Sequence, residues 1–302
     1  MKTKSSLWLA AFLVAASSIN GAETNMNRHS TASDRTIGTV ERASKVIGRE
    51  VRSNSDQKIG KIDDLVVDLE SGRILYAVVS AGGFIGVGDR LVAVPVSVFT
   101  EQNKQLRLDA DKQKLTDAPQ FVSSGDKRDE MFSPAFAGSV NKYFGGNATW
   151  MEDSSGKIGG KFGNVHTAND LIGMDVRNVS NETIAKVENV MVDLSAGRVP
   201  YVVLSPDRSL NLSAGRDALY AIPPNALTAS GDGKTLNTGI DKQKLASAPH
   251  FNKNQWPDMA NHSWATRVYE YFGKEPYFGQ GSLQPTSLRT NGLERLYYEP
   301  EK

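Results

Sequence analysis

Residues 43–80 read ASKVIGREVRSNSDQKIGKIDDLVVDLESGRILYAVVS, and residues 168–205 read ANDLIGMDVRNVSNETIAKVENVMVDLSAGRVPYVVLS. The two stretches align without a gap at a constant offset of 125 residues, and sixteen of the 38 positions are identical. The identities include whole strings, such as VDL at 67–69 and at 192–194. Self-similarity of this kind indicates a duplicated structural unit. Because there are two copies, the repeat predicts a tandem pair of domains rather than a solenoid.

The similarity continues on the C-terminal side of this stretch, with small changes in length. LVAVP at 91–95 corresponds to LYAIP at 219–223, and DKQKL at 111–115 recurs at 241–245. VNKYFG at 140–145 has a weaker counterpart in VYEYFG at 268–273. The duplication therefore reaches well beyond the opening stretch and includes most of the chain.

Each copy reads as β-strands joined by turns. β-Branched and aromatic residues fill 74–79 and 199–204, while short apolar runs at 91–94 and 219–222 end at a proline, as strands do. Apolar residues in steps of three at 59–67 and 184–192 would also suit a helix, but β-branching and flanking turn residues favour a bulged strand. Ser71-Gly72 and Ala196-Gly197 are predicted hairpin turns. Asp111 and Asp241 are predicted N-caps of short helices.

This pattern predicts an all-β fold with two tandem small β-barrels, short helical segments, a flexible linker and a tail. The expected divisions are a signal peptide at 1–22, an N-terminal linker at 23–42, a first barrel at 43–122 and a second barrel at 166–252. A Gly/Ser-rich linker with a short helix near 135–143 is expected at 123–165. An aromatic-containing, partly disordered extension is expected at 253–302. Packing of the two barrels on each other and formation of a homodimer both remain open.

The first copy is similar to the PRC-barrel domain family, which is named after the cytoplasmic domain of the photosynthetic reaction centre H subunit. A related barrel forms the C-terminal half of a ribosome maturation factor. The resemblance rests on an ordered set of glycines and strand motifs: Ala43–Gly48, Gly60, Val67-Asp68, Gly72, Tyr76–Ser80, Gly82-Gly83-Phe84, Gly86, Gly88 and Leu91–Pro95. It implies a six-stranded β-barrel that contacts other macromolecules, and it implies no catalytic residues. The second copy departs after Ser205, where PDRSLNLS at 206–213 replaces the Gly-Gly-Phe loop.

The first 22 residues predict a secretory signal, with Lys2 and Lys4 before the apolar run at 7–16 and a cut near Ala22. A buried N-terminal helix is the alternative. Removing this segment takes two lysines and no acids, so the formal charge of +1 becomes −1. We expect a periplasmic or secreted protein without a transmembrane segment in the mature chain. A charge this close to zero argues against a nucleic-acid partner.

The composition and the spacing of reactive residues exclude several kinds of site. The chain has no cysteine, which excludes disulfides, thiolate chemistry and Cys-based metal sites. Its four histidines show no zinc-ligand spacing, so we expect no metal, no cofactor and no catalytic residue. Asp63, Asp64 and Asp68 form a carboxylate cluster, with Glu188 and Asp193 in the second copy. Asp68 and Asp193 stand where a strand leads into a turn, so a role in accepting hydrogen bonds from nearby N–H groups is favoured over acid–base catalysis.

Two sets of residues are candidates for binding. The first is the interaction loop Gly82, Gly83, Phe84, Ile85 and Gly86, whose apolar tip could contact a partner or fold over the end of the barrel. It lacks the Lys-Ser/Thr that a phosphate-binding loop requires. The second set is the repeated charges Arg52, Arg73, Arg177 and Arg198, which could form one salt bridge in each barrel or an anion-binding patch.

The sequence favours an exported, non-enzymatic protein that acts as an interaction module of the bacterial cell envelope. A connection with stress is a further hypothesis. Its partner would be a protein or an envelope component. The alternative is a sensor that binds a small ligand or an ion in the cleft between the barrels. A hydrolase would need a polar cleft that the sequence does not reveal.

Overall fold

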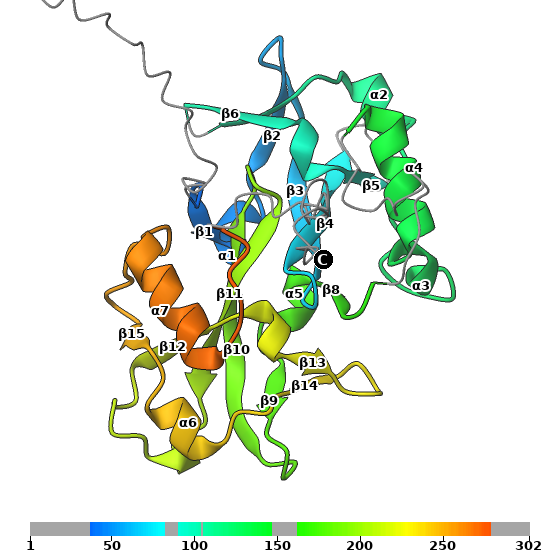
Figure 1. Cartoon of the computed structure of the whole chain (residues 1–302). Helices are drawn as coiled ribbons and strands as arrows, with labels where there is room; N and C mark the ends of the chain where they lie inside the picture. The colour runs from blue at the N-terminus through cyan, green and yellow to red at the C-terminus, as the bar shows by residue number, and fades with distance from the viewer. Residues whose placement is uncertain (1–36, 82–89, 104, 147–161, 279–302) are drawn as a thin grey trace, which may run out of the picture. The chain divides into compact units, whose positions relative to one another are not determined.

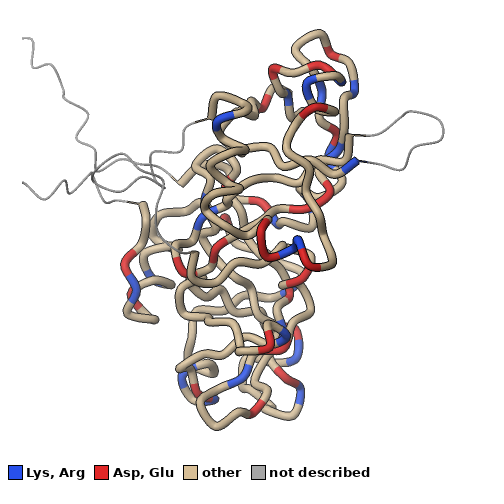
Figure 2. The backbone as a smooth tube through the Cα atoms, turned by 90° about the vertical axis from the view of Figure 1, so that its right-hand side faces the viewer, with Lys and Arg blue, Asp and Glu red and all other residues tan. Residues whose placement is uncertain are grey.

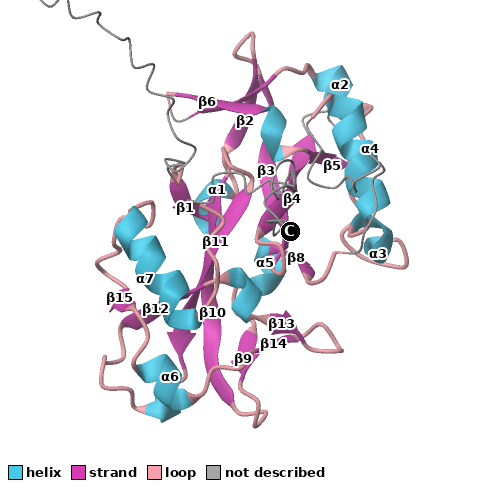
Figure 3. Ribbon diagram, viewed as in Figure 1, coloured by secondary structure: helices cyan, strands magenta, loops and turns pink. Residues whose placement is uncertain are grey.

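The computed structural model describes residues 37–81, 90–103, 105–146 and 162–278. Strands predominate, and the helices are short (Figure 3). The prediction of a mainly β fold with short helical segments is confirmed. No helix in these ranges is long and apolar enough to cross a membrane.

The elements of the two copies follow the same order along the chain, apart from one extra 3₁₀ helix and one extra strand in the second copy and one extra short helix in the first (Figure 1). The first copy contains β1 (Val40–Arg42), α1 (Ala43–Val46), β2 (Glu50–Ser53), β3 (Lys58–Asp68), β4 (Arg73–Ala81), β5 (Arg90–Val94), η2 (Val96–Val98), β6 (Phe99–Gln102), β7 (Gln105–Leu108), α2 (Lys112–Thr116), α3 (Arg128–Met131) and α4 (Pro134–Phe144). The second contains β8 (Val165–Thr167), α5 (Ala168–Leu171), β9 (Asp175–Arg177), β10 (Thr183–Asp193), β11 (Arg198–Pro206), η4 (Arg208–Leu210), β12 (Ala218–Ile222), η5 (Pro224–Ala226), β13 (Thr228–Ala229), β14 (Thr235–Asn237), α6 (Lys242–Ala246), β15 (His250–Asn252) and α7 (His262–Phe272).

Six strands in each copy pair in one order. In the first copy the order is β6–β7–β2–β3–β4–β5, and in the second it is β13–β14–β9–β10–β11–β12. The β2–β7 and β9–β14 pairs are parallel and the other neighbours are antiparallel. The described part of each copy therefore has the six strands that the family resemblance implies.

The long strands β3 and β10 are bulged, as predicted. The register of β3 against β4 shifts between Ile62 and Asp64, and that of β10 against β11 shifts between Val187 and Asn189. A bulge bends a strand, so one long strand can pair with more than one neighbouring strand along its length. The hairpin turns that follow contain Gly72 and Gly197 at φ of 62° and 63°, a left-handed conformation that favours glycine.

The duplicated unit includes a helix that packs outside each barrel. α4 and α7 are related by an offset of 128 residues, and both end at a left-handed glycine, Gly145 or Gly273. Tyr76 on β4 donates its hydroxyl to Met131 O at 2.5 Å, and Tyr201 on β11 donates to Met259 O at 3.3 Å. The helix expected near 135–143 is therefore present as α4, and it belongs to the first module.

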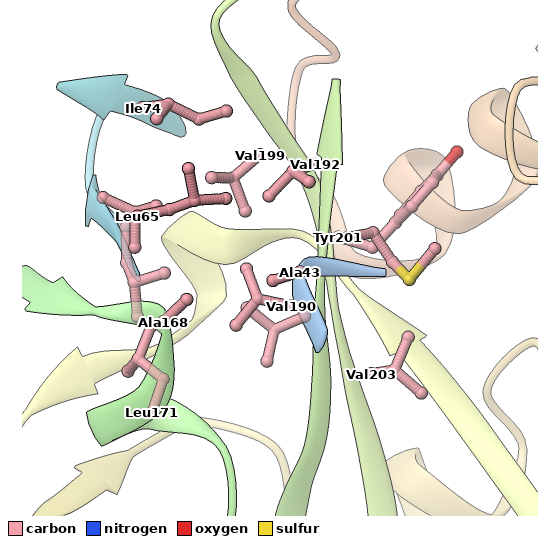
Figure 4. Close-up of a cluster of buried hydrophobic side chains, with 14 of the residues drawn as sticks. Ala43, Leu65, Ile74, Ala168, Leu171, Val190, Val192, Val199, Tyr201 and Val203 are labelled. Atoms are coloured by element: carbon pink, nitrogen blue, oxygen red, sulfur yellow. The ribbon is translucent and has the colours of Figure 1, made fainter. Parts of the chain in front are cut away.

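The core between the copies is built from equivalent residues. Ala43 and Ala168 are 0% exposed, as are Leu65 and its equivalent Val190. Figure 4 shows these side chains gathered with Ile74 and Val199, the first apolar residues of β4 and β11 after their arginines. One cluster of buried apolar residues thus contains side chains from both copies.

Candidate functional site

The two copies exchange their first strands. β1 leads into the first barrel but pairs with β10 of the second, where Val40 lies opposite Asp193. β8 leads into the second barrel but pairs with β3 of the first, where Val165 lies opposite Asp68. Because 40 and 165 are equivalent at the offset of 125, the exchange is reciprocal. We call this region, β1, β3, β8 and β10 with the ends of β4 and β11, the junction.

Two buried aspartates fix the exchanged segments in place. Asp193 is 0% exposed and accepts hydrogen bonds from Gly38 N at 2.8 Å and from Ala196 N at 3.0 Å. Asp68 is 3% exposed and accepts from Asn164 N at 3.0 Å and from Ser71 Oγ at 2.6 Å. Each carboxylate therefore binds its own turn and the leading segment of the other copy. The predicted role as acceptors at a turn is confirmed, and the contact with the other copy adds to it.

A second pair of equivalent residues, Asp64 and Asn189, lies four positions before Asp68 and Asp193 on the same strands. Asp64 Oδ1 accepts from Asn169 N at 3.2 Å, while Asn189 donates its Nδ2 to Ser44 Oγ at 2.8 Å. Burial is the main cause that raises the pKa of Asp64 above its ordinary value, and bonds to Leu65 and Asn169 partly offset it. The first copy thus carries a buried ionisable group where the second has a neutral amide.

The arginines that start β4 and β11 meet at the junction. Arg73 and Arg198 are opposite each other in an antiparallel pairing, with Ile74 N donating to Gly197 O at 3.0 Å and Val199 N to Gly72 O at 2.9 Å. Burial, and then the charge of Arg198, lower the pKa of Arg73 to about 10. A salt bridge repeated in each barrel and an anion-binding patch were the alternatives expected for these arginines, and the structure places Arg73 and Arg198 side by side.

The other repeated arginines have different partners in the two copies. Arg52 pairs with Glu50 at 3.2 Å and with Asp56 at 3.6 Å. Arg177 instead donates to the amide oxygen of Asn181 at 3.2 Å. The candidate loop Gly82–Gly86 lies outside the described residues. The structure therefore brings Arg73 and Arg198 together and leaves Arg52 and Arg177 on separate barrels.

A polar pocket of about 630 Å³ is lined by both copies. Arg128 and Phe132 come from the first, while His166, Asp170 and Lys234 come from the second. Arg128 and Asp170 form an ion pair. His166 Nε2 lies 2.9 Å from Asn164 Oδ1, and burial lowers the pKa of this histidine.

This pocket was missed by sequence reasoning, and one comparison of the copies bears on it. At the offset of 125, His166 corresponds to Glu41, so only the second copy has a histidine at this position. Nothing in either local pattern places Arg128 near His166. Within the described ranges, no group of three or more His, Asp or Glu residues is arranged to hold a metal ion.

Comparison with known families agrees with the repeat. A family model described as the PRC-barrel domain matches residues 38–115 and, separately, residues 163–239. The two ranges together make up just over half of the chain, and both include the exchanged first strand. Among curated proteins, no sequence matches the chain.

Proposed function

Because the chain belongs to the PRC-barrel domain family, we propose that it is an exported, non-enzymatic interaction protein of the bacterial cell envelope, which binds a protein or an envelope component. Use under envelope stress is part of the proposal. The N-terminal pattern of two lysines followed by the apolar run at 7–16 supports export. The junction supports a binding role, since it joins two modules into one framework.

The observation that carries the non-enzymatic proposal is the use of the buried carboxylates. Asp64, Asp68 and Asp193 are the buried acids among the described residues, and each one accepts backbone N–H bonds that hold the junction. A catalytic carboxylate must instead reach a substrate atom within hydrogen-bond distance. Their structural engagement therefore favours a framework over an active centre.

The charge distribution supports a partner other than nucleic acid. Lys and Arg are interspersed with Asp and Glu along the described chain in Figure 2. Nucleic-acid binding usually requires a basic face, because phosphate neutralisation supplies most of the affinity. Mixed charge suits a polar rim around a specific protein contact.

The proposal is tested by photocrosslinking in envelope extract, with the mature full-length chain carrying the crosslinker at Phe84 or, as the matched control, at Leu212 in the corresponding loop of the second barrel. We expect a reproducible adduct from Phe84, reduced when Ile85 is also changed to Ser. The absence of a reproducible adduct at Phe84, or an equally strong adduct at Leu212, would contradict an interaction role for the loop of the first barrel.

The alternative function, a sensor of small ligands or ions, is favoured by the pocket that both copies line. Arg128 and Lys234 supply cationic groups there, and Asp170 and His166 supply acceptors. Thermal-shift measurements with metals, anions and metabolites test it, with His166→Gln as the variant. The alternative fails when no compound raises the melting temperature of the unaltered protein.

A further inference from the structure

A second pocket lies on the second barrel, away from the junction. Its volume is about 640 Å³, and it is lined by the β9–β10 turn, by β14 and the segment after it, and by α6 and the end of α7. The lining residues that matter here are Val179, Asn181, Asn237, Lys244, Phe272 and Lys274. We call it the distal pocket.

The equivalent place on the first barrel is occupied by charged side chains that pair with one another. Arg107 Nη2 lies 2.7 Å from Asp56 Oδ1. Asn54 donates its Nδ2 to Asp109 Oδ1 at 2.8 Å, and Lys114 donates its Nζ to Asp109 O at 3.2 Å. This set of contacts joins the β2–β3 turn to β7 and to α2.

Strand register establishes which residues correspond. Arg52 lies opposite Arg107, and Arg177, the equivalent of Arg52, lies opposite Asn237. Asn237 therefore replaces Arg107. Two residues further along each chain, Gly239 replaces Asp109.

The remaining positions follow from the repeat offsets. At 125 residues, Val179 replaces Asn54 and Asn181 replaces Asp56. The shared helix motif places Lys244 at the position of Lys114. Lys274 stands where the first copy has Gly146, at the offset of 128.

These replacements change both the open volume and the net charge at this end of the second barrel. Two acids and one arginine become neutral or are removed, while Lys244 stays and Lys274 is added. Among the described residues that line the distal pocket, none is acidic, and neither lysine forms an ion pair within the described ranges. The pocket therefore has an unbalanced positive charge that an anionic ligand would neutralise.

The uncharged residues of the lining indicate which other chemical groups the ligand has besides its anionic group. Asn181, Asn225 and Asn237 supply amides, which both donate and accept hydrogen bonds, as sugar hydroxyl groups do. Val179, with 82% of its surface exposed, and Phe272 supply apolar contact of the kind that the C–H face of a sugar ring offers. We propose that the distal pocket binds an acidic sugar, with the carboxylate near Lys244 and Lys274 and the hydroxyl groups near the asparagines.

This site is separate from the loop of the proposed function, so either can fail without the other. Titration calorimetry of the mature chain with D-glucuronate, D-glucose and inorganic phosphate tests it. We expect saturable binding of glucuronate, at least about tenfold weaker binding of glucose, and weaker binding of phosphate than of glucuronate. No saturable binding of glucuronate would overturn the proposal, and so would equal binding of glucose or of phosphate.

Two matched variants locate the site. Lys244→Gln should weaken glucuronate binding about tenfold, since it removes a charge-assisted bond, while Lys114→Gln on the first barrel should leave it unchanged. Equal effects of the two substitutions would overturn the assignment to the second barrel.

The triple variant Asn181→Asp, Asn237→Arg and Gly239→Asp restores the residues of the first copy. A Cβ added at Gly239 meets no atom within 4 Å, so a side chain can begin there without a clash. The variant should retain the melting temperature and lose glucuronate binding by about tenfold or more. A folded triple variant that binds glucuronate normally would overturn the proposal.

Discussion

The two repeats share the aspartates that hold the junction and differ in the charged residues at the distal pocket. At the junction, Asp68 and Asp193 accept N–H bonds from the leading segment of the other copy. At the other end, Asp56 of the first copy pairs with Arg107, while the equivalent Asn181 lines an open pocket.

The difference follows from what each region must contact. A side chain at the junction faces the other copy, so its replacement disturbs both halves at once. A side chain at the distal pocket faces only its own barrel and solvent, so it can change without affecting the pairing of strands. The junction therefore defines the framework, and the diverged end is where a copy can acquire its own ligand.

The largest expected effect comes from removing a junction carboxylate. Asp193→Ala removes a fully buried carboxylate and deprives the N–H groups of Gly38 and Ala196 of their acceptor, and should lower the free energy of unfolding by about 3 kcal/mol. Asp68→Ala should cost a similar amount, because its contacts are equivalent. Urea denaturation measures both.

The matched control is Lys58→Ala, which removes an exposed ion pair to Glu50 and should leave the urea midpoint nearly unchanged. If the Asp193→Ala and Asp68→Ala midpoints also stay at the unaltered value, the two aspartates do not hold the junction.

The next largest effect comes from giving the second copy the buried carboxylate that the first copy has at the junction. Asn189→Asp introduces a second buried carboxylate and removes the Nδ2 donor to Ser44 Oγ. We expect a loss of about 2 kcal/mol at pH 7, measured by denaturant titration. A variant as stable as the unaltered protein would show that this position is hydrated.

The reverse change should stabilise the protein. Asp64→Asn keeps the Oδ1 acceptor for Leu65 N and Asn169 N and removes a charge that burial disfavours. We expect a gain of about 1 kcal/mol at pH 7. Because the folded-state pKa of Asp64 is raised, its penalty is present at high pH and disappears as pH falls, so the gain should vanish below the ordinary value of 3.8. A gain that is independent of pH would contradict this origin.

A smaller effect is expected at His166 when pH is lowered. Its folded-state pKa lies below the ordinary 6.5, mainly through burial, with Asp170 and Asp68 opposing and Arg128 assisting the shift. The unfolded chain therefore takes up a proton first, and stability is lost as pH falls below 6.5. When the pH is lowered from about 7.5 to about 5, the melting temperature of the His166→Gln variant should fall less than that of the unaltered protein. Parallel pH profiles of the two proteins would contradict the prediction.

Local chemistry was sufficient to predict the framework of each copy. β-Branched runs, the turns at Gly72 and Gly197, and the caps Asp111 and Asp241 act within a few residues, so their outcome can be predicted from the sequence. The number of strands in each barrel came with the family resemblance, whereas the order in which they pair was not predicted.

The junction could not be predicted in the same way. β1 and β8 are three-residue strands, VER and VHT, with no periodic pattern, and their pairing depends on contacts with residues about a hundred or more positions away. Asp68 and Asp193 were predicted as local acceptors, because a sequence pattern contains no signal for the distant N–H that each also binds.

The distal pocket had a signal that went unused. Alignment of the copies shows that the acid at 56, inside the opening stretch, is replaced by Asn181, and that the acid at 109, beyond it, is replaced by Gly239. The candidate loop at 82–86 lies outside the described residues, so its role stays a prediction.

The central claim is that the exchanged strands make the two copies one cooperative unit, and tryptophan fluorescence tests it directly. Trp256 and Trp264 both lie in the second copy. With Trp8 and Trp150 replaced by Phe, the signal reports the second copy alone. Val140, 0% exposed in α4 of the first copy, is then changed to Ala.

We expect Val140→Ala to lower the free energy of unfolding by about 2 kcal/mol, and to shift the tryptophan-detected and far-UV circular dichroism midpoints by the same amount. A tryptophan midpoint that stays at its original value while circular dichroism separates into two transitions would contradict the claim.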